Sequence, residues 1–144
     1  HYIENNDNAA LELARTVAEG TGAWVAEGAW VEGLAAWRMG HCSLAGEAFA
    51  RVAGIASNVE LAAAGHYWAA RAAVRCREPG LSQQHLSAAA RMDETLYGML
   101  AADQLGIELP QHAPPVPMSR DDWGQLQQRP NVRVAAALIE IGRP

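Results

Sequence analysis

The side chains most able to do chemistry in this sequence are its two cysteines, Cys42 and Cys76, and its five histidines. A cysteine beside a histidine can act as a nucleophile, and groups of both residue types bind zinc. The residue spacings typical of such sites are absent, because the sequence has no CxxC, HxxxH or HExxH pattern. We therefore predict no catalytic, metal-binding or cofactor-binding residue in this chain. A small helical enzyme that uses Cys42 or a histidine is an alternative.

The sixteen acidic residues show no pattern of a hydrolytic site. Glycosidases place two carboxylates in one cleft, and one of them has a raised pKa. Here the acidic residues are spread over predicted helix faces and ends. Asp121 and Asp122 lie at a predicted helix start, where negative charge is favourable. We predict that each carboxylate either caps a helix or is solvated.

Cys42 and Cys76 have a second interpretation, as a disulfide pair. They lie about one helical repeat apart, each near the end of a predicted helix. In a stack of hairpins those two ends lie on the same side. Equivalent positions in neighbouring repeats are usually farther apart than the roughly 4.4–6.8 Å between Cα atoms that a disulfide needs. The two residues are therefore either a disulfide or two free thiols, and a free-thiol assay distinguishes these states.

Charge and hydrophobicity along the sequence argue against nucleic-acid binding and against a membrane-spanning segment. The net charge is −5, and all eleven basic residues are arginines that form no cluster along the sequence. We therefore predict no nucleic-acid binding. No apolar run approaches the roughly 20 residues that span a bilayer, so we predict no membrane span. With 144 residues, the chain is long enough to bury one sizeable core.

The elements that position these residues are predicted to be helices only. Half of the residues are hydrophobic and many of these are alanine, the strongest helix former, whereas no segment alternates like a strand. The sequence predicts eight helices, over residues 6–19, 23–39, 43–56, 59–77, 82–91, 93–105, 119–128 and 130–141. Four polar residues are predicted N-caps: Ser43, Asn58, Ser82 and Asp93. Ser119 and Asp122 resemble a capping box.

Short loops between these helices predict antiparallel hairpins. In residues 33–52, Gly33, Gly40, Ala45 and Phe49 have the small–small–Ala–large spacing of a tetratricopeptide repeat. Each such hairpin exposes an apolar face that only its neighbour can cover, so hairpins stack. We predict an all-α fold in which stacked antiparallel helical hairpins form a tetratricopeptide-like α/α solenoid, or superhelix.

The solenoid is predicted to occupy residues 1–109. Residues 110–118 hold four prolines in nine positions, which excludes a helix and predicts an extended Pro-rich connector. Residues 119–144 are predicted to form a further helical hairpin of the same solenoid. Pro130 suits the first turn of the second helix in that hairpin.

The large aromatic residues among the alanines have two interpretations. Trp30 and Trp37 lie two helical turns apart and share a face, whereas Trp24 points elsewhere. Such residues form either an aromatic wall for sugar stacking or the packing between helices. We favour packing, because alanine-rich hairpins need a few large side chains to fill their gaps. Tyr67 and Trp68 are adjacent, so they cannot face the same side of their helix.

Two helical segments carry a family resemblance. The first reads HYWAARAAVR and contains Tyr67, Trp68 and Arg71, and the second reads ETLYGMLAADQLG and contains Tyr97 and Gly98. With RPNVRVAAALIEIG farther along, they resemble the non-catalytic superhelical region of soluble lytic murein transglycosylases, over residues 30–142. These five residues are expected to pack where hairpins stack. We expect Gly98 to permit a close helix crossing and the Tyr97 phenol to bond to a neighbouring backbone group.

The resemblance implies a periplasmic scaffold that acts in peptidoglycan cleavage or remodelling of the bacterial cell wall. That family's catalytic domain carries a Glu–Ser pair, and no Glu is followed by Ser here, so we expect no enzyme activity from this chain alone. An oxidising periplasm favours the Cys42–Cys76 disulfide. The expected partners are peptidoglycan or another protein, or a second copy bound through exposed end hairpins. The alternative is a free-standing tetratricopeptide-like protein-interaction module.

Overall fold

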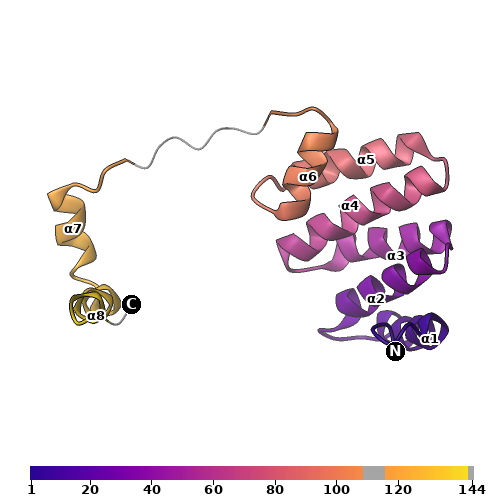
Figure 1. Cartoon of the computed structure of the whole chain (residues 1–144), viewed down its shortest axis with the longest axis horizontal. Helices are drawn as coiled ribbons and strands as arrows, with labels where there is room; N and C mark the ends of the chain where they lie inside the picture. Colours follow the sequence, from indigo (N-terminus) through magenta and orange to yellow (C-terminus); the bar gives the residue numbers. More distant parts are fainter. Residues whose placement is uncertain (109–115, 143–144) are drawn as a thin grey trace. The chain divides into compact units, whose positions relative to one another are not determined.

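The computed structural model of the chain describes residues 1–108 and 116–142, and the regular elements in these residues are helices joined by loops. Over these residues it has no strand (Figure 1), which confirms the all-α prediction. The helices are α1 (Asp7–Ala18), α2 (Val25–Arg38), α3 (Cys42–Ile55), α4 (Val59–Arg75), α5 (Pro79–Ala90), α6 (Leu96–Gln104), α7 (Arg120–Leu126) and α8 (Pro130–Glu140). Each overlaps one predicted helix. None of them is both long and apolar enough to cross a membrane.

The chain divides into two compact units, His1–Pro110 and Gln111–Pro144. The first unit holds α1 to α6 and the second holds α7 and α8. Most of the predicted Pro-rich connector, residues 110–115 of 110–118, lies outside the described residues. Membership of residues 119–144 in the same solenoid stays a prediction.

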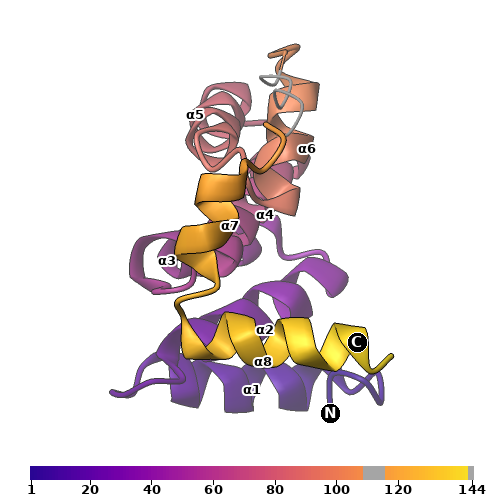
Figure 2. The same cartoon turned by 90° about the vertical axis from the view of Figure 1, so that its left-hand side faces the viewer.

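In the first unit, each helix packs against the next one along the chain, and α4 also packs against α6. The two views in Figures 1 and 2 show these helices following one another from α1 at one end to α5 and α6 at the other. Alanine and glycine allow this close approach because their small side chains let helix backbones come near each other. At Gly65 in α4, a Cβ atom would lie 2.7 Å from the Ala53 nitrogen and 2.8 Å from the Phe49 oxygen of α3.

An aromatic cluster fills the space between α2, α3 and α4. Phe49 is fully buried, with its ring centroid 5.3 Å from that of Trp30 and 5.9 Å from that of Trp68. Trp68 also meets Trp37 edge to face at 5.6 Å. This arrangement confirms packing as the role of Trp30, whereas Trp24 is 72% exposed and lies outside the cluster.

Two predicted caps are confirmed. The Asn58 side chain accepts a hydrogen bond from the Glu60 backbone at the start of α4. Ser119 and Asp122 form a reciprocal capping box at the start of α7. Pro130 occupies the first turn of α8, as predicted. Local sequence is sufficient for these features, because a cap bonds to residues only two or three positions away.

Three other predicted caps, Ser43, Ser82 and Asp93, are wrong. Helix α3 already includes Ser43, and α5 begins at Pro79, so Ser82 lies within the helix. A proline is favoured in the first helical turn, where its missing N–H needs no partner. Helix α6 is capped by Thr95, whose hydroxyl accepts a 2.9 Å hydrogen bond from the Gly98 nitrogen.

Two details of the Tyr97–Gly98 segment also differ from expectation. A Cβ at Gly98 would overlap the Met92 carbonyl oxygen, which belongs to the loop before α6 rather than to another helix. The Tyr97 ring packs on Tyr67, with centroids 5.3 Å apart. Among the described residues, the Tyr97 phenol makes no hydrogen bond to backbone. Gly98 therefore permits a tight loop, and Tyr97 contributes to packing between α4 and α6.

Glu32 is an exception to the prediction that carboxylates cap helices or are solvated. It lies in α2 and is only 2% exposed. Arg15 from α1 donates to one carboxylate oxygen at 3.3 Å, and Arg51 from α3 pairs with the other. A buried carboxylate requires such partners, because burial removes its hydration. The three side chains therefore tie α1, α2 and α3 together.

Candidate functional site: an arginine–tryptophan groove

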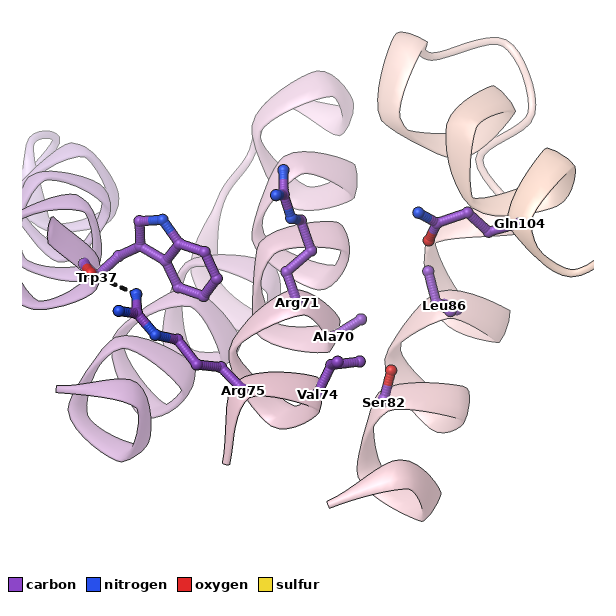
Figure 3. A pocket seen from close by; sticks show the side chains of 8 residues that line it. All are labelled: Trp37, Ala70, Arg71, Val74, Arg75, Ser82, Leu86 and Gln104. Carbon is purple, nitrogen blue, oxygen red and sulfur yellow. Dashed lines mark hydrogen bonds between the residues drawn. The ribbon is translucent and has the colours of Figure 1, made fainter. Parts of the chain in front are cut away.

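A groove of about 450 Å³ runs over the first unit (Figure 3). It receives one residue from α2, four from α4, two from α5 and one from α6. Its lining residues are Trp37, Ala70, Arg71, Val74, Arg75, Ser82, Leu86 and Gln104.

Helix α4 supplies the charged side of the groove. Arg71 and Arg75 lie four residues apart, so they project from the same face of the helix. Ala70 and Val74 lie beside them, displaced toward α5. The periodicity of one helix thus places two cations next to a short apolar surface.

Tryptophan rings hold both arginines in place. The Arg75 Cζ atom lies 4.9 Å from the centre of the Trp37 ring, and its Nη1 donates a 3.0 Å hydrogen bond to the Trp37 carbonyl oxygen. The Arg71 Cζ atom lies 4.7 Å from the Trp68 ring and 5.6 Å from the Trp37 ring. A cation is attracted to the face of an aromatic ring, and stacking restricts the guanidinium group. The two positive charges are therefore positioned over one tryptophan.

The positive charge of this arginine pair has no counter-ion in the described part of the chain. No ion pair joins Arg71 or Arg75 to any carboxylate of the described residues, although the chain is acidic overall. The guanidinium group of arginine is a cation in proteins. Like charges four residues apart on a helix repel each other. An anion bound beside either guanidinium group would reduce this repulsion.

The opposite side of the groove is formed by α5 and α6. Leu86 lies across the groove from Ala70 and Arg71, with Gln104 beside it (Figure 3). The Gln104 Nε2 atom donates a 3.3 Å hydrogen bond to the Tyr67 hydroxyl, which leaves its amide oxygen as an acceptor. The groove can therefore bind a ligand that has an anionic end, an aliphatic part and amide groups.

Cys42 and Cys76, the candidate pair from the sequence, are joined by a disulfide with 5.7 Å between their Cα atoms. The bond links the first residue of α3 to the C-cap of α4. The Ser43 hydroxyl lies 3.5 Å from the Cys76 sulfur. In this state Cys42 has no thiol with which to act as a nucleophile.

Four of the five residues that carry the family resemblance divide between two places. Arg71 lines the groove, and its guanidinium group lies over the Trp68 ring. Tyr67 packs against Tyr97 on the α6 side of α4. Sequence reasoning identified Arg71 only as a packing residue and did not single out Arg75. The signal that was missed is their spacing, with two arginines four residues apart on a helix that also carries an aromatic pair.

A pair of histidines was also missed. His66 of α4 and His85 of α5 approach each other, with 3.0 Å between their Nδ1 atoms. Burial lowers the pKa of both imidazoles, and the nearby charge of His85 lowers the pKa of His66 further. Within the described ranges, no group of three potential metal-binding residues occurs. The two residues are far apart in sequence, so only the packing of α4 on α5 brings them together.

Comparison of the chain with protein-family models, curated proteins and solved structures found no match.

Proposed function

We propose that this chain is the non-catalytic scaffold of a periplasmic lytic transglycosylase and that it holds peptidoglycan for cleavage or remodelling. The arginine–tryptophan groove is the observation that carries the proposal. Two positioned cations that pair with no carboxylate of the described residues, beside an apolar wall, make a binding surface for an anionic chain. Peptidoglycan is such a chain, because its peptide stems bear carboxylates.

The proposed architecture is a tetratricopeptide-like solenoid. Consecutive helices pack in order, α4 also contacts α6, and residues of α2, α4, α5 and α6 line one groove. These features support a stack of helical hairpins. A binding surface of this kind extends as hairpins are added.

The proposed location is the periplasm, and the Cys42–Cys76 disulfide supports it. Disulfides persist in oxidising compartments such as the bacterial periplasm and are rare in the cytosol. The cross-link holds α3 against the end of α4, the helix that carries Arg71 and Arg75. An oxidising location would thus stabilise the charged side of the groove.

The parent reaction would be the non-hydrolytic cleavage of peptidoglycan that leaves a 1,6-anhydro end. The resemblance implies this chemistry for the whole protein, and the absence of a Glu–Ser pair supports a scaffold role for the present chain.

A protein-interaction module is the second candidate, and the exposed face of α6 favours it. Leu96, Met99 and Leu100 are each more than one third exposed and share one side of this helix. Apolar residues gathered on a surface are typical of protein contacts. A partner protein, or a second copy of the chain, would cover them.

The experiment is co-sedimentation of the purified chain with bacterial peptidoglycan sacculi, with cellulose as the neutral polysaccharide control. We expect the chain to pellet with sacculi and not with cellulose. We also expect no loss of sacculus turbidity and no release of 1,6-anhydro products. A chain that stays in the supernatant at low salt, or one that releases such products, overturns the proposal.

A further inference from the structure

Two histidines meet where α4 packs on α5. His66 and His85 are half-buried, and their Nδ1 atoms lie 3.0 Å apart. Their ring centres are 5.3 Å apart, and the excess over the distance between the nitrogens corresponds to one imidazole radius at each end. The two nitrogens therefore lie close to the line that joins the ring centres and point at each other. Two ligands of one metal ion would instead point at a third position off this line. The geometry is that of a hydrogen bond.

This hydrogen bond limits the number of protons that the pair can hold. A neutral imidazole carries one hydrogen, on either ring nitrogen, so one Nδ1 donates and the other accepts. One more proton can bind to the outer Nε2 of the donor ring and leaves the bond intact. When both rings are protonated, both Nδ1 atoms carry hydrogen, so the bond is lost and two cations face each other. The contact between α4 and α5 therefore tolerates one added proton and not two.

The carboxylates nearest to the pair do not neutralise a second charge. Glu47 of α3 and Glu78 at the N-cap of α5 line the cavity that His85 also lines. Among the described residues, no ion pair joins either carboxylate to a histidine. The other charged residue of α3, Arg51, pairs with Glu32.

The remaining titratable groups on the helices around the pair are also engaged elsewhere or exposed. On α4, Arg71 and Arg75 line the groove of Figure 3, and Glu60 lies exposed in the first turn. Helix α5 has no charged residue besides its histidine. In α6, Asp103 is exposed, and Tyr97 packs on α4 with a phenol that is neutral below about pH 10.

Acid therefore favours separation of the two rings. Burial lowers the pKa of both imidazoles, and the charge of His85 lowers the pKa of His66 further. In water an imidazole has a pKa near 6.5. Below this pH the separated rings bind more protons than the rings in contact, so the equilibrium shifts toward separation as the pH falls.

The two sides of α4 are held with different strength. On one side, the Cys42–Cys76 disulfide joins α3 to α4. On the other side, a small cluster holds α5 and α6 on α4, with Tyr67 packed on Tyr97 and Ala89 buried beside them. Separation of the histidines should therefore release α5 and α6 while α3 stays on α4.

His85 directly precedes Leu86, and α5 and α6 together supply Ser82, Leu86 and Gln104 to the groove. We propose that the His66–His85 contact is a pH-sensitive latch, in which one shared hydrogen keeps α5 and α6 on α4, and protonation of both rings releases them and removes their side of the groove. The latch changes the groove whatever occupies it, so it goes beyond the proposed function.

The first measurement detects the shared hydrogen. Long-range proton–nitrogen NMR spectra of the intact disulfide-bonded chain at about pH 8, where both rings are neutral, report which nitrogen of each imidazole carries hydrogen. We expect opposite tautomers, with hydrogen on Nδ1 of one ring and on Nε2 of the other. Hydrogen on Nε2 of both rings would leave no donor between them and would overturn the inference.

The second measurement is backbone hydrogen exchange, corrected for the exchange rate of an unfolded chain at each pH. From about pH 6 to about pH 5, the protection of α5 and α6 amides should fall about 10-fold, because opening binds at least one more proton. At about pH 5 it should lie at least about 10-fold below the protection of α3 amides. Equal protection in α3 and α5 would show that the whole unit opens together. Unchanged protection of α5 would show that the contact does not respond to acid. Either result overturns the latch.

Protein variants identify the titrating groups. His66→Asn/His85→Asn keeps a donor and an acceptor near the Nδ1 positions without the titration, so protection of α5 and α6 should stay within about two-fold over the same pH range. His41→Gln removes an exposed histidine of the same unit and should leave the fall in protection intact. A fall that persists in the double variant, or disappears in His41→Gln, contradicts the proposal. The tautomer measurement uses the unaltered chain, so it tests the shared hydrogen even if the double variant does not fold.

Discussion

Reduction of the Cys42–Cys76 disulfide should destabilise the first unit by a few kcal/mol. The bond closes a loop between residues separated by 34 positions in the sequence. Loop-closure entropy for about 35 residues corresponds to ~3.8 kcal/mol at 25 °C, and native disulfides generally contribute about 2–4 kcal/mol. The unfolded chain gains this freedom when the bond is broken, whereas the folded helices keep their other contacts.

Urea denaturation of the unaltered chain, followed by circular dichroism at 222 nm with and without dithiothreitol, measures the effect. With a denaturant slope of about 2 kcal/mol/M, a loss of this size lowers the midpoint by about 1–2 M. A Cys42→Ser/Cys76→Ser variant should unfold at the reduced midpoint in both conditions. It is the control for effects of the reductant on anything other than this bond.

The reasoning is refuted if the unaltered chain shows two reactive thiols in urea without reductant, because the bond would then be absent. It is also refuted if the bond is present and reduction leaves the midpoint unchanged. In that case the loop would already be constrained in the unfolded chain. The thiol assay separates these two outcomes.

The remaining predictions concern helix packing and charge. Gly65→Ala should destabilise the fold by about 1–3 kcal/mol, because its Cβ would meet the α3 backbone at 2.7 Å, whereas Gly54→Ala, with open space around it, should be neutral or stabilise α3 by about 0.5–1 kcal/mol. Glu32→Ala should destabilise the fold by about 2 kcal/mol, and this value allows for the partial exposure of the two arginine partners. Stability should fall as the pH drops below about 6.5, because burial lowers the pKa of His66 and His85 below this ordinary value and the unfolded chain then binds more protons. Urea midpoints measure the effects of the three substitutions, and midpoints at several pH values measure the pH dependence.

Each of these predictions has an outcome that contradicts it. Equal midpoints for Gly65→Ala and Gly54→Ala would show that α3 and α4 are not in close contact at Gly65. An unchanged midpoint for Glu32→Ala would show that the carboxylate contributes nothing to stability. A His66→Gln/His85→Gln variant should lose the part of the pH dependence that begins near pH 6.5, and a profile identical to that of the unaltered chain would place its origin elsewhere.

The sequence predicts the helices well and their first residues less well. The caps at Asn58 and Ser119 involve bonds to residues two or three positions away, so they follow from local sequence. Ser43 and Ser82 looked equally suitable. Pro79 starts α5 earlier than Ser82 would, and α3 begins at the disulfide-bonded Cys42. A polar residue near a helix start is a cap only if no earlier residue begins the helix.

Local sequence patterns do not predict the candidate site. Arg71 was named through the family resemblance, yet its role as a groove residue depends on Trp37 from α2 and Gln104 from α6. The buried Glu32 and the His66–His85 pair were missed for the same reason, since their partners are on other helices.

The sequence by itself determined that the regular elements of residues 1–108 and 116–142 are helices, the face on which each helix carries its large residues, and the cations of α4. Helical periodicity is sufficient for these properties, because it relates residues only along one helix. The tertiary structure decided which faces meet, and so placed Trp37 beneath Arg71 and Arg75, joined Cys42 to Cys76 and buried Glu32 between two arginines. The offset between neighbouring helices depends on how all their side chains pack together, and no local pattern in the sequence contains that information.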